Sequence, residues 1–132
     1  MPRLYREAPV NAIWEGSGNI MCLDVLRAIG RVPNAGDVLR AELDVDDKRV
    51  RALAGRLMQR FSGADGHDEA QARVLTRDLV QALQAALLVK HAPAAVADAF
   101  CASRLDDDGR AFGMLPRGLD LRAVAERAGP VL

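Results

Sequence analysis

The stretch DEAQARVLTRDLVQALQAALLVK, residues 68–90, decides the fold class. Its apolar residues recur three and four positions apart, which is the spacing of one face of an α-helix and not the two-residue alternation of a half-buried strand. The residues expected to face the core are Leu75, Leu79, Ala82, Leu83, Ala86 and Leu87. The pattern predicts a helix over about 68–90, the longest in the chain.

Segments on both sides of this helix show the same spacing. The segment after Asp46 and Asp47, either of which can cap a helix, is strongly amphipathic and stops at Gly63. Further helices are expected over about 19–29, 34–43, 93–105 and 120–127. Short polar connections between such segments are typical of an antiparallel bundle. We therefore predict an all-α fold: an antiparallel helical bundle with an up-and-down four-helix core and short extra helices.

Two of the expected helices carry capping signals at their ends. Ser17 or Asn19 can cap the first of the buried helices, which is expected to run to about Ile29, where Gly30 and then Pro33 supply a stop signal. The short helix that follows opens on Asn34 and Asp37, which have the spacing of a capping box. Each signal predicts a helix boundary.

Composition restricts the class of protein. The chain has 18 Lys and Arg and 18 Asp and Glu, so its formal net charge is zero, whereas a protein that grips nucleic acid by charge alone carries a positive excess. Cys22 and Cys101 are interpreted as buried thiols, and His67 and His91 lack a second ligand at useful spacing, so no metal site is expected. No stretch is long enough to span a bilayer and no secretion signal is recognisable, which predicts no membrane partner and a cytoplasmic protein.

The first 18 residues show no amphipathic period and contain two prolines and two glycines, which predicts a loop or extended strap. The helix after them is apolar around most of its circumference and is expected to be buried on nearly all sides. Its apolar residues are Ile20, Met21, Cys22, Leu23, Val25, Leu26, Ala28 and Ile29. A strap without a core that leads into such a helix is typical of a surface that packs against further protein.

The loop WEGSGN, residues 14–19, contains a candidate base. Glu15 lies between Trp14 and the flexible pair Gly16 and Ser17, directly before a helix. An indole neighbour desolvates a carboxylate and raises its pKa, which suits the carboxylate to accept a proton, and a glycine lets a flat ligand approach the backbone. A loop glutamate is also commonly a solvated surface charge, and the residues alone leave both interpretations open.

A family resemblance covers nearly all of the chain. The run LYREAPVNAIWEGSGNIMCLDVLRA, residues 4–28, resembles the acyl-CoA dehydrogenase segment in which YR-x-A-x-x-x-x-IYEGT precedes a buried helix. Here Trp14 replaces the tyrosine and Ser17 replaces the threonine. With the following GNIMCLDVLR, these substitutions are similar to the AidB branch of the superfamily, and FCASRLDDDGRAFG and LRAVAERAG agree with it.

The resemblance implies the C-terminal four-helix bundle of the family, with residues 1–18 as the strap that carries the motif and 19–132 as the bundle. In the family this part completes an FAD site together with N-terminal helical and central β domains, which are absent here. We therefore expect FAD in the full-length protein and none on this fragment alone. The resemblance also implies a homo-oligomer, a dimer or tetramer.

The resemblance also implies a reaction, the α,β-dehydrogenation of a short or branched acyl-CoA. In the family the glutamate of the motif removes the α-proton of the acyl-CoA while a hydride passes to the flavin, and Glu15 matches that glutamate. Residues expected to line the cofactor site are Trp14, Gly16, Ser17 and Asn19. Arg27 is either a site-lining residue or the partner of Asp24 in an ion pair within one helix.

Two alternatives stay open. Proteins of the AidB branch also bind DNA, and a protective protein with weak or vestigial dehydrogenase activity would use a basic surface. Candidate contacts to double-stranded DNA are Lys48, Arg49, Arg56 and Arg60, on the polar side of one helix with no acid after Asp47 to offset them. A solvated helix face has the same composition. The other alternative is a purely structural or oligomerisation bundle.

Overall fold

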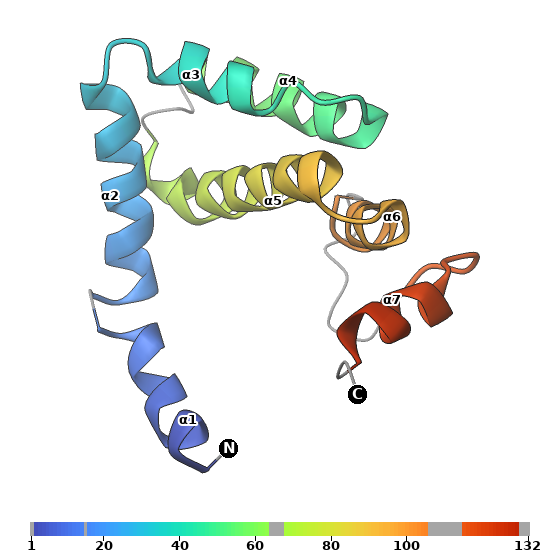
Figure 1. Ribbon diagram of the computed structural model, residues 1–132. Helices are drawn as coiled ribbons and strands as arrows, with labels where there is room; N and C mark the ends of the chain where they lie inside the picture. The colour runs from blue at the N-terminus through green and yellow to red at the C-terminus, as the bar shows by residue number, and fades with distance from the viewer. Residues whose placement is uncertain (1, 15, 64–67, 106–114, 130–132) are drawn as a thin grey trace.

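The computed structural model describes residues 2–14, 16–63, 68–105 and 115–129 (Figure 1). In chain order the elements are α1 (Pro2–Glu7), the 3-10 helix η1 (Ala8–Ala12), α2 (Gly18–Arg31), α3 (Ala35–Glu42), α4 (Lys48–Ser62), the 3-10 helix η3 (Glu69–Gln71), α5 (Ala72–His91), α6 (Ala94–Arg104) and α7 (Leu121–Ala128). The described residues contain no strand, so the predicted all-α helical bundle is confirmed. Among these helices none is long and apolar enough to cross a membrane.

Helix α5 occupies the centre of the fold (Figure 1). Helices α2, α4 and α6 all pack against it; α4 lies alongside it and runs antiparallel, whereas α2 crosses it steeply. Leu26 of α2 packs against Ala72 and Leu75 at the start of α5. The larger core joins α4, α5 and α6, and its most deeply buried members are Leu43, Val50, Leu57, Ala82, Ala85, Ala86 and Cys101.

Aspartate N-caps begin two of the α-helices. The Asp47 carboxylate accepts hydrogen bonds from the backbone N–H groups of Arg49 at 2.8 Å and Val50 at 3.4 Å. Asp120 accepts one from the N–H of Ala123 at 2.9 Å. Each carboxylate satisfies N–H groups that the first turn of a helix leaves without a partner. Of the two caps predicted for α4, Asp47 is therefore the one that forms.

The start of the chain is helical, so the prediction of a loop or strap is wrong over residues 2–12. Proline suits the beginning of a helix because no N–H is needed there, and Pro2 begins α1. Within α1, Arg3 Nε lies 2.9 Å from Glu7 Oε1, and this i,i+4 ion pair stabilises the short helix. No residue of α1 or η1 is buried, which confirms that the segment has no core of its own.

The end of α2 also differs from the prediction. Gly30 was expected to stop the helix, but α2 continues through it to Arg31. Val32 then adopts an extended conformation, with φ −95° and ψ 110°. The following Pro33 disfavours a helical conformation in the residue before it, so Pro33, the second of the two predicted stop signals, ends α2, and Gly30 does not.

Burial of α2 on nearly all sides is a further prediction that is wrong for this chain. Only Leu26 is fully buried, while Ile20 and Met21 are 51% and 47% exposed. The reason is that, among the described residues, α2 packs mainly on α5 and to a smaller extent on α3, which cover one side of it. The opposite side remains open to solvent.

Two smaller predictions are wrong as well. Asn34 begins α3, but its side chain makes no capping hydrogen bond, and Asp37 instead lies 3.6 Å from Arg40 in an ion pair one turn along. Leu87 was expected in the core and is 52% exposed, whereas Ala85 is fully buried. The two positions are about 200° apart around a helix, so the buried stripe of α5 that takes in Ala85 excludes Leu87.

Candidate functional site

The candidate site is the junction between η1 and the start of α2. The candidate base, Glu15, lies outside the described residues. Of its two neighbours, Trp14 is 73% exposed. Gly16 has a φ of +120°, a backbone conformation that residues other than glycine rarely adopt. Ser17 is extended at the N-cap position, yet its side chain makes no hydrogen bond to α2. The junction therefore presents an indole, a glycine and a helix start without a side-chain cap.

An exposed apolar surface surrounds this junction. Figure 1 shows that α1 and η1 lie beyond the N-terminal end of α2, on the side away from α4. Large apolar side chains are exposed on α1, on η1, on the connection after η1 and on the first turn of α2. They are Leu4, Tyr5, Val10, Ile13, Trp14, Ile20 and Met21, here called the N-terminal apolar surface. Isolated apolar residues are ordinary on a protein surface, but a set of this size on consecutive elements is typical of an interface.

Asn19 is held by a residue that the sequence did not indicate. Arg73, at the beginning of α5, donates a hydrogen bond from Nε to Oδ1 of Asn19, 54 residues earlier in the chain. Its guanidinium also lies against Gly18, because a Cβ added there would be 3.3 Å from Arg73 Nη2. Of the residues expected to line the cofactor site, Asn19 is thus the one whose side chain has a defined partner. No local pattern links two positions so far apart.

Arg27 forms the ion pair that was one of its two interpretations. Its Nη1 lies 2.7 Å from Asp24 Oδ1, and both side chains are more than half exposed. A pair of this kind within a helix stabilises it by only a few tenths of a kcal/mol. Contact between Arg27 and a cofactor or substrate stays a prediction.

No acid follows Asp47 along α4 itself, but acids from α6 and α5 pair with two residues of its basic side. Arg49 lies 2.7 Å from Asp47 and 2.8 Å from Asp98 of α6, and the hydrogen bond that it donates to Asp47 raises the pKa of its guanidinium. Arg60 lies 3.4 Å from Asp78 of α5. Lys48 and Arg56 are exposed on α4. Contact between this side of α4 and double-stranded DNA stays a prediction.

The two thiols differ in their surroundings. Cys101 is fully buried and its pKa is raised by that burial, as expected of a structural thiol. Cys22 is half-buried beside Leu26. Within the described ranges, no three His, Cys, Asp or Glu side chains come together in a way that could hold a metal ion.

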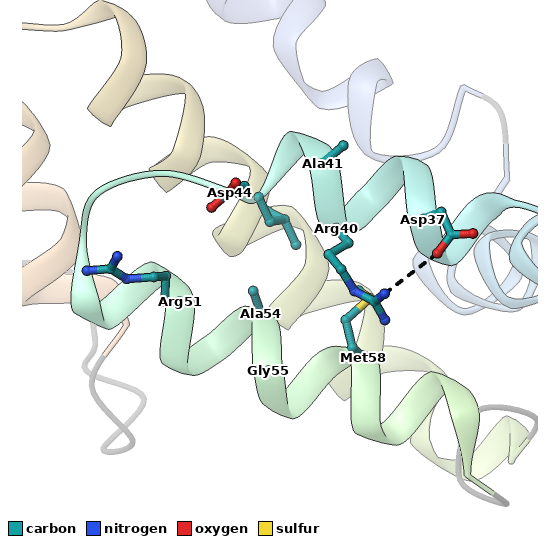
Figure 2. Close-up of a pocket in the computed structure, with 9 residues that line it drawn as sticks. Asp37, Arg40, Ala41, Asp44, Arg51, Ala54, Gly55 and Met58 are labelled. Atoms are coloured by element: carbon teal, nitrogen blue, oxygen red, sulfur yellow. Dashed lines mark ion pairs between the residues drawn. The ribbon is translucent and has the colours of Figure 1, made fainter.

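A groove of about 600 Å³ lies between α3 and α4 (Figure 2). Its floor is apolar, and its two ends are charged, with the Arg40–Asp37 pair beside Met58 at one end and Asp44 and Arg51 toward the other. It shares no residue with the junction at the start of α2. The groove is therefore separate from the candidate site.

Comparison with known proteins identifies a relative. No protein-family model and no solved structure matches the chain. The chain is 39% identical over 129 residues to the candidate acyl-CoA dehydrogenase AidB of Escherichia coli (strain K12). The match covers 94% of this chain and 23% of that protein, so the chain spans about a quarter of the length of its relative. An identity of this size along almost the whole chain shows that the chain belongs to the AidB-like acyl-CoA dehydrogenase superfamily.

Proposed function

We propose that this chain is the C-terminal helical part of an FAD-dependent acyl-CoA dehydrogenase, which introduces an α,β double bond into a short or branched acyl-CoA. The observation that carries the proposal is the 39% identity to AidB over 94% of the chain, and the motif WEGSG directly before α2 supports it. Under this proposal, N-terminal helical and central β domains precede the chain in the complete protein. These domains would cover the N-terminal apolar surface.

The described residues around the motif fit a flavin. A flavin is flat and largely apolar, and it carries hydrogen-bond acceptors on its ring and on its phosphates. Gly16 leaves room beside the backbone, since a Cβ added there would only touch Ile20 at 3.5 Å. Trp14 and Ile20 offer exposed apolar surface, and the first turn of α2 has no cap from Ser17. These features support a cofactor that brings both an apolar face and acceptor atoms.

Each residue of the junction has a separate role in the proposed reaction. Glu15 takes the proton from the α-carbon of the acyl group, as the matching glutamate does in the family. FAD, when bound, supplies the acceptor for the hydride that leaves the β-carbon. Trp14 excludes water from the carboxylate of Glu15, and Gly16 permits close approach to the backbone. The isolated chain is expected to be inactive, because 132 residues of helix cannot enclose both ligands.

The test uses the complete protein to which this chain belongs. We expect it to copurify with FAD and to lose the flavin absorbance when a short or branched acyl-CoA is added anaerobically. The variant Glu15→Gln should keep its FAD while the rate of flavin reduction falls about 10²- to 10⁴-fold, the usual contribution of a general base. Glu7→Gln is the matched control, because Glu7 is exposed on α1 and pairs only with Arg3 in the described structure. A protein without flavin, or an unchanged rate in Glu15→Gln, would refute the proposal.

A further inference from the structure

The contact between Arg73 and Asn19 determines which hydrogen-bonding group Asn19 presents. A guanidinium carries only donors, so the atom of Asn19 that faces it must be the carbonyl oxygen Oδ1. The amide nitrogen Nδ2 therefore lies on the other side of the planar carboxamide. Among the residues that the structure describes, none accepts a hydrogen bond from this nitrogen. Within that part of the chain, the side-chain N–H of Asn19 is therefore a donor without an acceptor.

The same contact keeps the side-chain oxygen of Asn19 from capping the start of α2. Asparagine near the start of a helix commonly turns its side-chain oxygen onto a backbone N–H of the first turn. Here Ser17 makes no cap and the oxygen of Asn19 is held by Arg73 from another helix. Gly18 lets the guanidinium come this close, because a Cβ there would crowd Nη2 at 3.3 Å. The first turn of α2 is consequently a surface of donors.

We propose that Arg73 is a positioning residue for the cofactor: by holding Oδ1 of Asn19, it turns the amide N–H of Asn19 toward an acceptor oxygen of the bound FAD. This inference rests on the proposed function and adds a residue that the motif at the start of α2 does not contain. It also specifies the chemistry of the contact, because a donor group selects an acceptor oxygen of the ligand and rejects a donor. Because the side chain of Asn19 is already oriented before FAD binds, it loses less conformational entropy on binding.

Four variants of the complete protein separate the contributions to FAD affinity. Asn19→Ala removes the donor and should weaken binding about tenfold, the upper range for one hydrogen bond. Asn19→Asp keeps an oxygen for Arg73 but loses the donor, and should weaken binding at least as much. Arg73→Met leaves Asn19 in place and frees its rotation, for which we expect about a threefold loss. Arg73→Lys retains a donor and should restore the affinity to within about twofold of the wild type.

The matched control is Arg77→Met, the same substitution one turn along α5 at a residue that pairs with Asp78 and not with Asn19. FAD affinity is measured by titration of the apoprotein, and thermal unfolding of each apo variant reports any loss of structure.

The outcomes are distinguishable. Loss of affinity in Asn19→Ala together with unchanged affinity in Arg73→Met would overturn the positioning role of Arg73. Wild-type affinity in Asn19→Asp would show that no donor is used and would overturn the inference as a whole. A wild-type protein that binds no FAD would refute the proposed function itself, and the role of Asn19 with it.

Discussion

Removal of the Asp47 charge is predicted to destabilise the chain by about 2 kcal/mol at pH 7. Asp47 is only 16% exposed, and its carboxylate accepts hydrogen bonds from the backbone and from the side chain of Arg49, with Nη2 to Oδ2 at 2.7 Å. The side-chain hydrogen bond from Arg49 is the main cause that lowers its pKa from 3.8 to about 2. At about 1.4 kcal/mol per pH unit, this difference corresponds to roughly 2 kcal/mol of folding free energy.

Two substitutions at Asp47 separate the charge from the cap. Asparagine caps a helix as well as aspartate does, so Asp47→Asn removes the charge alone and should cost about 2 kcal/mol. Asp47→Ala removes the cap as well and should cost about 1 kcal/mol more. Asp46→Asn is the matched control, because the neighbouring Asp46 is 98% exposed and should change stability by less than about 0.5 kcal/mol.

The pH dependence gives the sharper test. Because the pKa of Asp47 is lower in the folded state, its contribution is fully present above the unfolded value of 3.8 and is lost as the pH falls toward 2. The difference in unfolding free energy between the wild type and Asp47→Asn should thus shrink to about half by pH 3. Urea unfolding followed by circular dichroism at pH 7, 5, 4 and 3 measures it. Equal stability at pH 7, or a difference that does not change down to pH 3, would contradict the reasoning.

Three further predictions follow from exposed positions. Gly55→Ala should stabilise the chain by about 0.5–1 kcal/mol in thermal unfolding, because Gly55 lies inside α4 and a Cβ there meets nothing within 4 Å. A loss of stability would contradict the open space beside Gly55. Trp14 should give a red-shifted fluorescence maximum and be quenched freely by acrylamide in this chain, and a blue-shifted maximum here would mean that the N-terminal apolar surface is covered. Binding to duplex DNA, the alternative function, should weaken with rising salt and in Lys48→Glu combined with Arg56→Glu, and binding that ignores both changes would rule out the basic side of α4.

Local signals predicted much of the fold. Asp47 and Gly63 could be identified as the ends of α4 because capping depends on a few consecutive residues. The helical spacing of residues 68–90 likewise predicted α5 and most of its buried face. Helix α1 was missed because six residues are too few to show a period, and its ion pair between Arg3 and Glu7 is a weak signal in a sequence.

Contacts between distant parts of the chain could not be predicted. Arg49 and Asp98 are 49 residues apart, and Arg73 and Asn19 are 54 apart, and nothing in the sequence pairs an arginine with one particular distant oxygen. The candidate site was found through the family motif, because the residues around a loop glutamate do not show whether it is a catalytic base or a solvated surface charge. The role of Glu15 therefore stays a proposal that depends on the complete protein.

The alanines of α5 have a consequence for how stability depends on temperature. Ala82, Ala85 and Ala86 are almost entirely buried where α5 joins the main core. Alanine has no rotamers to lose on burial and removes little apolar area from water. Compared with a core of larger side chains, this part of the fold therefore loses less side-chain entropy on folding and gains less from hydrophobic burial. The heat capacity change of unfolding should accordingly lie at the low end of the range for a chain of this length, about 1.6 kcal/mol/K. The stability curve of the chain is then expected to be broad, with little variation over ordinary growth temperatures.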